Sequence, residues 1–156
     1  MNYWLMKSEP DSFSIDDLAA RPEKTEHWDG VRNYQARNMM RDQMKKGDLI
    51  FFYHSSCKQP SIVGIARVIK EAYPDFTAFD IKNKYYDPRS SPSNPRWYMV
   101  NVQFVRKLKR DISLQELKTY KSLAGLPLLQ RGNRLSIMPI GKNQWDFILK
   151  LEHQSS

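Results

Sequence analysis

The alternating stretch from Tyr98 to Phe104 constrains the fold of this chain more than any other pattern. Its aromatic and valine positions alternate with Met99, Asn101 and Gln103, which is the period of two expected for a strand. Apolar runs predict further strands near residues 3–7, 49–54, 62–70 and 135–140, and a possible strand near 77–82. Residues 83–96 contain three prolines, each after a small polar residue or Asp, and predict a long loop.

Helices are expected in four places. Ser14 and Ser113 each precede an acidic residue three positions later, as in a capping box, and should open short helices. Residues 34–46 follow a helical period, Trp145 lies in an expected closing helix, and residues 20–27 are expected to be polar loop. Because strands outnumber long helices and do not alternate strictly with them, we predict a mixed α+β barrel. A length of 156 residues suits one domain, 1–156.

Composition narrows the class of partner. Lys and Arg number 25 and Asp and Glu 17, which gives a net charge of +8 and favours nucleic acid as partner. The single cysteine excludes a disulfide scaffold and a multi-cysteine zinc site, and the three histidines are too scattered for a zinc site. No phosphate-loop or dinucleotide motif occurs. We therefore expect no cofactor, no metal and no membrane span, and an intracellular protein.

Four segments occur in an order that resembles the EVE domain family. They are Lys7-Ser8-Glu9-Pro10, Trp28-Asp29-Gly30-Val31-Arg32-Asn33, the strand that ends in Tyr53-His54-Ser55, and Tyr85-Tyr86-Asp87-Pro88. The similarity runs from about Tyr3 to Leu151. It implies a PUA-like mixed β-barrel flanked by helices, related to the YTH readers of methylated adenine. It also implies recognition of a modified base in DNA or RNA. The lack of a basic N-terminal extension leans towards a bacterial protein of the cytoplasm, and a nuclear location is the expectation for a eukaryotic one. We expect a monomer.

The resemblance assigns a pocket for the modified base. The residues alone favour a place in the core for Trp28. The resemblance to the family makes it the expected stacking residue, since an aromatic face stacks on any base. The other expected pocket residues are edge readers and close-approach positions, namely Ser8, Asn33, Tyr53, His54, Ser55, Pro60 and Gly64. For each of them a structural role is the alternative: Asn33 suits a helix cap and His54 a packed histidine.

Basic and aromatic side chains are expected around that pocket. Glu9 is suited either to accept from an exocyclic amine or to form a structural ion pair. Contacts to phosphate are expected from Lys7, Arg89 and a basic stripe at four-residue spacing, Arg37, Arg41 and Lys45, although such stripes are often only solvated faces. Tyr85, Tyr86 and Trp97 flank the long loop and are expected either to grip nucleic acid or to pack.

Two other functions stay open. Some barrels related to this fold are amidohydrolases that use a Lys, a hydroxyl and a Glu, and Lys7, Ser8 and Glu9 supply these types. Consecutive strand residues point in alternate directions, which makes their convergence difficult. A protein-interaction module with a vestigial pocket is the other alternative. We favour a nucleic-acid-binding protein without catalysis.

Overall fold

The strands form one six-stranded sheet in the computed structural model, which describes residues 1–155. The order is β2-β5-β4-β3-β1-β6; β1 and β3 are parallel and the other neighbours antiparallel. The strands are β1 Tyr3–Ser8, β2 Thr25–His27, β3 Leu49–His54, β4 Ser61–Pro74, β5 Tyr98–Ser113 and β6 Ile137–Ile140. The parallel pair therefore lies inside the sheet, and the carboxyl ends of β1 and β3 meet at one edge.

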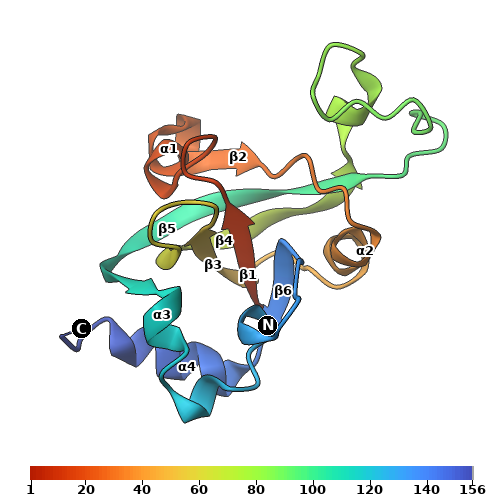
Figure 1. Cartoon of the computed structure of the whole chain (residues 1–156). Coiled ribbons are helices and arrows are strands. Elements are labelled where there is room, and N and C mark those ends of the chain that lie inside the picture. Colours follow the sequence, from red (N-terminus) through yellow and green to blue (C-terminus); the bar gives the residue numbers. More distant parts are fainter. Residues whose placement is uncertain (156) are drawn as a thin grey trace.

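Within residues 1–155, four α-helices lie around the sheet (Figure 1). They are α1 Ile15–Ala20, α2 Tyr34–Asp42, α3 Leu114–Leu117 and α4 Lys142–Leu151, and short 3-10 segments cover Pro22–Lys24, Phe76–Phe79, Lys121–Leu123 and Pro127–Leu129. Helix α1 lies beside β2 and α2 lies beside β6, whereas α3 and α4 lie together away from α2 (Figure 1). Residues 75–97 project from the far ends of β4 and β5 and form an excursion from the body of the molecule.

The sheet buries both of its faces. Along β1, Trp4 and Met6 belong to one core and Leu5 to the other, and along β3 the rings of Phe52 and Phe51 divide in the same way. The first core packs beneath α1 and α2, and the second beneath α3 and α4. Successive strand residues point to opposite faces, so an apolar run such as residues 49–53 serves two cores at once.

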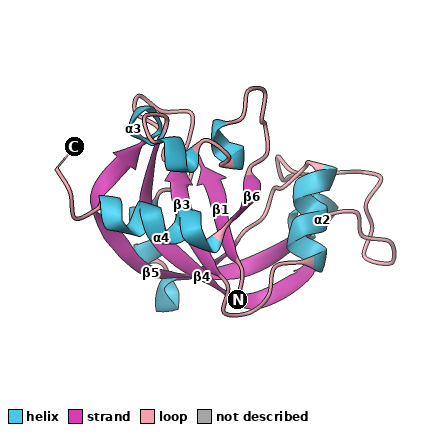
Figure 2. Ribbon diagram, turned by 90° about the horizontal axis from the view of Figure 1, so that it is seen from below, coloured by secondary structure: helices cyan, strands magenta, loops and turns pink. Residues whose placement is uncertain are grey.

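Strands β4 and β5 give the sheet its curvature. They pair over most of their lengths of 14 and 16 residues, and their register shifts at four places. Each such irregularity bends the bulged strand and increases its twist. The sheet consequently curves strongly (Figure 2), which is the mixed α+β, barrel-like arrangement predicted from the sequence.

Most predicted elements are confirmed, and three differ. The helix expected over residues 34–46 ends at Asp42, because the backbone N–H of Lys45 turns to donate to the buried carboxylate of Asp48. The expected strand near 77–82 is a 3-10 segment, since Asp75 caps it by accepting from the Thr77 N–H. Residues 20–27, expected to be loop, contain the edge strand β2.

An ion pair closes the C-terminal end of the fold onto β5. The carboxylate of Glu152, which is 1% exposed, accepts two hydrogen bonds from the guanidinium of Arg106 at 2.7 and 2.8 Å. It also accepts from the backbone N–H of Lys109 at 2.9 Å. These hydrogen bonds, led by that from Arg106, lower the pKa of Glu152 to about 2.

We expect this ion pair to make stability depend on pH in the acid range. The pKa of Glu152 is lower in the folded protein than its ordinary value of 4.5, so its contribution is complete above about pH 4.5 and is lost as the pH falls towards 2. Glu152→Gln should lower the free energy of unfolding at pH 7 and flatten its decline between those values. Urea unfolding of both proteins at several pH values measures this; identical acid limbs would contradict the assignment.

Candidate functional site

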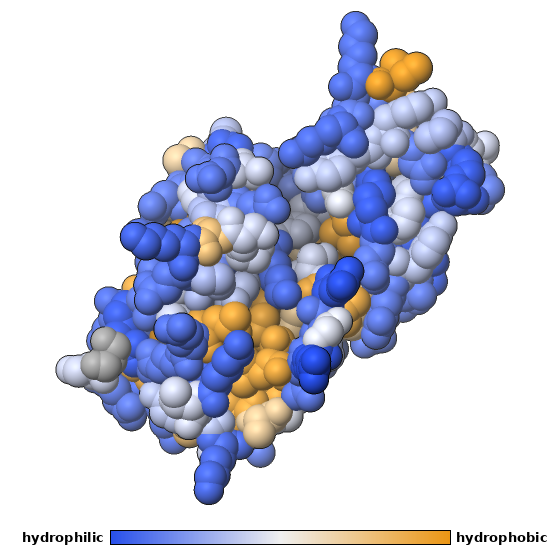
Figure 3. All heavy atoms as spheres, in the orientation of Figure 1, coloured by the Kyte–Doolittle hydropathy of each residue, from blue (hydrophilic) through white to orange (hydrophobic). Residues whose placement is uncertain are grey.

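A cavity of about 550 Å³ opens between the α1–β2 side of the molecule and the excursion. The hollow is visible in Figure 3, between these two parts. Its wall includes the carboxyl end of β1, where the Ser55 N–H donates to the carbonyl of Ser8 at 2.9 Å. The lining residues are Lys7, Ser8, Glu9, Ser12, Phe13, Arg21, Glu26, His27, Trp28, Asp29, Gly30, Val31, Arg32, Ser55, Lys84, Tyr85, Arg134 and Ser136.

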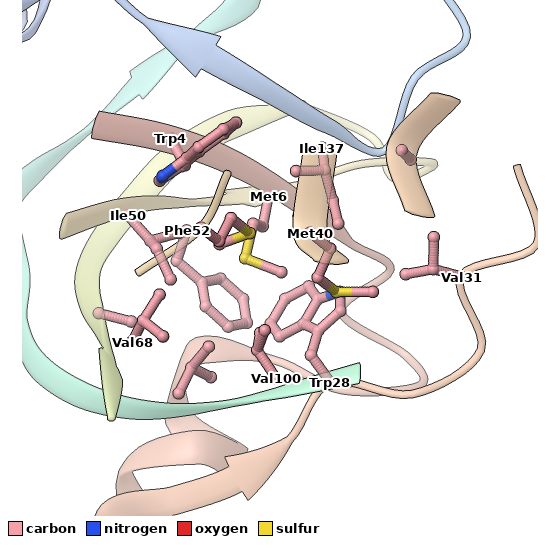
Figure 4. Packing of buried hydrophobic residues seen from close by; sticks show 14 of the residues in the cluster. Trp4, Met6, Trp28, Val31, Met40, Ile50, Phe52, Val68, Val100 and Ile137 are labelled. Atoms are coloured by element: carbon pink, nitrogen blue, oxygen red, sulfur yellow. The ribbon is translucent and has the colours of Figure 1, made fainter. Parts of the chain in front are cut away.

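Trp28 is both a wall of this cavity and a member of the first core. Its indole packs edge-on against Phe13 and Phe52, with ring centroids 6.4 and 5.5 Å apart, and 9% of the residue is exposed. Figure 4 shows the indole among core side chains that include Phe52 and Met40. The backbone N–H of Trp28 donates to the carbonyl of Val100 at 2.8 Å, which fixes it to β5. A place in the core and a place in the wall of the cavity, the two alternatives for Trp28, are thus compatible.

Tyr85 supplies a second aromatic wall because Gly30 has no side chain. Gly30 adopts a φ of +81°, and a β-carbon there would lie 2.5 Å from Cζ of the Tyr85 ring. Only glycine takes this backbone conformation without cost and also admits the ring so closely. The Asp29-Gly30 turn after Trp28 therefore brings the long loop against the cavity.

A buried ion pair holds the two walls together. The carboxylate of Asp75, fully buried, accepts from the Gly30 N–H at 2.8 Å and from Nη1 of Arg32 at 3.1 Å. The same guanidinium donates from Nη2 to the carbonyl of Tyr85 at 2.7 Å and lies 5.4 Å from the centroid of its ring. Arg32 therefore links the segment that carries Trp28 to the loop that carries Tyr85.

The charges of the cavity fall into paired and unpaired groups. Arg21 and His27 both contact the carboxylate of Glu26. Burial raises the pKa of the Asp29 carboxyl and lowers the pKa of the Lys7 amine, so both groups sit in a partly dehydrated space where hydrogen bonds to a ligand are strengthened.

Six of the expected site residues line the cavity. Trp28, Ser8, Ser55, Lys7, Glu9 and Tyr85 come together there from β1, the turn after β2, the end of β3 and the excursion. The hydroxyl of Ser8 donates to the carbonyl of Phe13, so its oxygen keeps only acceptor capacity. These positions follow the segments that carried the family resemblance.

The five other expected pocket residues lie outside the cavity and have structural surroundings. Asn33 caps α2 by accepting from the Ala36 N–H at 3.0 Å, and Nε2 of His54 accepts from the N–H of Ile15 at 3.1 Å. Tyr53 is buried in the second core, which raises its pKa to about 12. Gly64 packs against the side chain of Ile15, and Pro60 lines a separate hollow beside Leu114. These five residues do not line this cavity, and a role for them in recognising a base stays a prediction.

The basic stripe also differs from expectation. Arg37 donates to the carbonyl of Arg96 at 2.8 Å, and Arg41 forms an ion pair with Asp42 at 2.8 Å. Helix α2 ends before Lys45, so the three side chains do not continue along one helical face. None of the three lines the cavity.

Of the other expected residues in and beside the long loop, Trp97 is buried, whereas Tyr86 and Arg89 are exposed. Trp97 is 6% exposed, donates from Nε1 to Asp87 at 2.7 Å and stacks on Tyr34 with centroids 4.8 Å apart. It packs rather than lining the cavity.

Several cavity residues escaped the sequence analysis. They include Phe13, Arg21, Glu26, His27, Asp29, Arg32, Lys84, Arg134 and Ser136. Asp29 and Arg32 belong to the segment Trp28-Asp29-Gly30-Val31-Arg32-Asn33 and could have been predicted from it. Arg134 and Ser136 come from the turn before β6, which carries no recognisable motif. Ser136 reaches the site because its carbonyl accepts from the Lys7 N–H at 2.8 Å.

Between residues 1 and 155, no three His, Cys, Asp or Glu side chains gather where they would hold a metal ion. Within the same residues, none of the helices has the length and apolar character needed to cross a membrane.

Comparison with known proteins identifies close relatives. The model of the EVE domain family matches residues 2–151. Mouse thymocyte nuclear protein 1 is 53% identical over 168 residues, which cover 97% of this chain and 74% of the relative. The structure of human thymocyte nuclear protein 1 (THYN1) in complex with DNA containing 5-methylcytosine superposes with a TM-score of 0.92 at 49% identity, and the similarity covers both chains fully.

A more distant structure bears on the fold alone. The YTH domain of the Zygosaccharomyces rouxii MRB1 protein, solved with N6-methyladenosine RNA, matches with a TM-score of 0.56 at 14% identity. The match covers 99% of this chain and 86% of the YTH chain. Together with the six-stranded mixed sheet, it confirms the expected PUA-like α+β fold.

We expect Gly30→Ala to separate the two aromatic walls. The substitution adds a β-carbon that overlaps the Tyr85 ring at a backbone φ of +81°, and should cost about 1–3 kcal/mol of stability and displace the ring. Gly132→Ala is the matched control, because Gly132 has a φ of +77° and nothing within 4 Å of an added β-carbon. Thermal unfolding measures the loss of stability, and nuclear Overhauser contacts of the Tyr85 ring measure its displacement. Equal effects of the two substitutions would contradict the close packing.

Proposed function

This chain belongs to the EVE domain family, and from this membership and the geometry of the cavity we propose that it binds DNA and takes a modified base of the 5-methylcytosine type between Trp28 and Tyr85. The observation that carries the proposal is the cavity with two aromatic walls in a protein 49% identical to one solved with 5-methylcytosine DNA. The chain is proposed to act as a single domain. RNA carrying a modified base is the alternative partner, with the same cavity.

The apolar part of the cavity suits the ring and its methyl group. Trp28, Phe13 and Tyr85 all line it, and the rings of Phe13 and Trp28 pack edge-on against each other. Stacking on aromatic side chains contributes about 1–3 kcal/mol per base and tolerates any base. Affinity for an extruded base would come from stacking on these walls. Preference for the methylated base would come from burial of the methyl group against them, since each buried methylene-sized group contributes about 0.8 kcal/mol.

The polar part of the cavity suits the edge of cytosine. Cytosine presents an amine donor at N4 beside acceptors at N3 and O2. Asp29 and Glu9 are carboxylates that line the cavity, and Lys7 is a donor there whose pKa burial lowers. We propose that a carboxylate accepts a hydrogen bond from the N4 amine. Asp29 is the stronger candidate, because burial already limits its contact with water. Lys7 is proposed to donate to N3 or O2 of the ring.

Phosphate contacts are proposed at the mouth of the cavity rather than on α2. Five cationic side chains line it; Arg21 and Arg32 are paired with carboxylates. Within residues 1–155, the side chains of Lys7, Lys84 and Arg134 form no ion pair in the structure. Unpaired cations beside a base pocket are placed to meet the backbone of the same nucleic acid.

Catalysis is the minority alternative. Lys7, Ser8 and Glu9 all line the cavity, which meets the first requirement of an amidohydrolase. The hydroxyl of Ser8, however, donates to the carbonyl of Phe13, and its proton is therefore directed away from a general base. We propose binding without turnover. Location in the cytoplasm, or in the nucleus if the protein is eukaryotic, and a monomeric state stay predictions. The mouse and human relatives carry the name thymocyte nuclear protein 1.

Trp28→Ala tests the proposed pocket. It should lower stability by about 3–5 kcal/mol, because the indole is part of the first core. It should also weaken binding of a 5-methylcytosine oligonucleotide roughly ten- to a hundredfold. Fluorescence anisotropy with methylated and unmethylated oligonucleotides of one sequence, below the melting temperature of the variant, measures the second effect.

Trp145→Ala is the matched control for that variant. Trp145 is buried in the second core, where it stacks on Phe51, and does not line the cavity. It should lose comparable stability while its affinity per folded molecule stays unchanged. If both variants lose affinity equally, the weaker binding reports a loosened fold and the proposed pocket is wrong.

Salt dependence tests the proposed phosphate contacts. Lys84→Ala and Arg134→Ala should each make the plot of log affinity against log salt concentration shallower by about 0.7–0.9, the effect of one phosphate contact. Preference for the methylated base should not change. Arg41→Ala is the control, because Arg41 is already paired with Asp42 and lies outside the cavity. If the salt slope changes in the Arg41 variant alone, the phosphate contacts lie along α2 and not at the cavity.

A further inference from the structure

The excursion, residues 75–97, is fixed at its base. The N–H of Asp75 donates to the carbonyl of Trp97 at 2.8 Å, so the two ends are joined. The carboxylate of Asp75 pairs with Arg32, and the indole N–H of Trp97 donates to Asp87. The excursion therefore stands on the body of the molecule as a built feature (Figure 1).

Two successive turns form the segment of the excursion that reaches the cavity. The N–H of Asn83 donates to the carbonyl of Asp80 at 2.9 Å, and the N–H of Tyr86 donates to the carbonyl of Asn83 at 3.0 Å. The first residue of each turn also caps it, since Asp80 accepts from the Lys82 N–H and Asn83 from the Tyr85 N–H. Such side-chain bonds stabilise a turn locally. The second turn carries the cavity residue Tyr85, so the first turn has a fixed place beside the cavity.

The first turn presents an apolar side chain to water. Ile81, at its first central position, is 75% exposed, the most exposed large apolar residue after the N-terminal Met1. The outer end of the excursion shows apolar atoms next to hydrophilic ones (Figure 3). Its neighbours Lys82 and Lys84 are exposed cations, and Lys84 lines the cavity. Three residues span at most about 11 Å, so the Cα of Ile81 lies within that distance of the Cα of Lys84.

We propose that Ile81 is a wedge that enters the base stack of double-stranded DNA at the step from which the cavity withdraws the modified base. This inference rests on the proposed function of the cavity. Extrusion of a base leaves an unstacked gap that costs a few kcal/mol in a duplex. Isoleucine is among the residues that insert between base steps, and the lysines beside it match the charge of the adjoining phosphates.

Ile81 suits this role better than Phe76, another exposed apolar residue near the cavity. Phe76 is 51% exposed, but its ring packs edge-on against the imidazole of His27 with centroids 5.0 Å apart. Withdrawal of Phe76 would uncover a residue that lines the cavity. Ile81 has no such attachment to give up, and the turn that holds it does not need its side chain.

The wedge gives binding a dependence on strandedness that the cavity alone does not have. In a single strand, the base reaches the cavity without leaving a paired partner and a closed stack behind. The side chain of Ile81 then has no gap to fill. Its contribution should appear for a matched duplex and be absent for the same strand alone.

The test compares Ile81→Ala with the unaltered chain on two DNAs of one sequence, a matched duplex with one 5-methylcytosine and the corresponding single strand. Ile81→Ala should bind the duplex roughly tenfold more weakly and the single strand with unchanged affinity. Val105→Ala is the control, since Val105 is 41% exposed on β5 and does not line the cavity; it should change neither affinity.

The outcomes separate this inference from the proposed function. Equal weakening on both DNAs, or no weakening on the duplex, would overturn the wedge while a retained preference for the methylated base leaves the cavity assignment standing. A duplex that the unaltered chain does not bind, although it binds the methylated single strand, would overturn it as well. Binding by the unaltered chain that ignores methylation on both DNAs would instead remove the proposed function, and the wedge with it.

Discussion

The buried carboxylate of Asp75 is the contact on which the candidate site depends. It accepts from the backbone of Gly30 and from Arg32 on one side, and caps the 3-10 segment that begins the excursion on the other. A carboxylate removed from water must be paired and hydrogen-bonded to persist, so its partners are held in one arrangement. Because Arg32 also donates to the carbonyl of Tyr85, the distance between the aromatic walls is set by this buried pair rather than by either wall.

Trp28 ties the stability of the first core to the shape of the cavity. The same indole contacts Phe52 within the core and lines the space proposed for the base. A pocket wall that belongs to the core moves little, which preserves the alignment needed for selective recognition. The cost is that this position has little freedom to change. Asp29 and Glu9 in the polar lining have no part in either core. Substitutions at these two positions would therefore change the proposed specificity at a smaller cost in stability.

Local patterns predicted the elements well and the site unevenly. Capping residues such as Ser14 and Ser113, and the alternation after Tyr98, act over a few residues and were confirmed. The errors arose where a distant group decides the local structure, as Asp48 does for the end of α2 and Asp75 for the segment expected to be a strand. Short motifs located Lys7, Ser8 and Trp28, whereas Arg134 joins them only through sheet pairing that no local signal encodes.

The central place of β1 has a consequence for the order of assembly. Its neighbours β3 and β6 come from residues about 46 and 135 positions away in the chain, and contacts of such separation form slowly because the loop must close first. Synthesis proceeds from the N-terminus, so Lys7 and Ser8 are made long before the segment that carries Arg134 and Ser136. A nascent chain would hold the aromatic walls without the final rim of the cavity. The cavity would therefore be completed only when the last strand is released and added to the sheet, and until then the chain would lack the part of the lining that Arg134 and Ser136 supply.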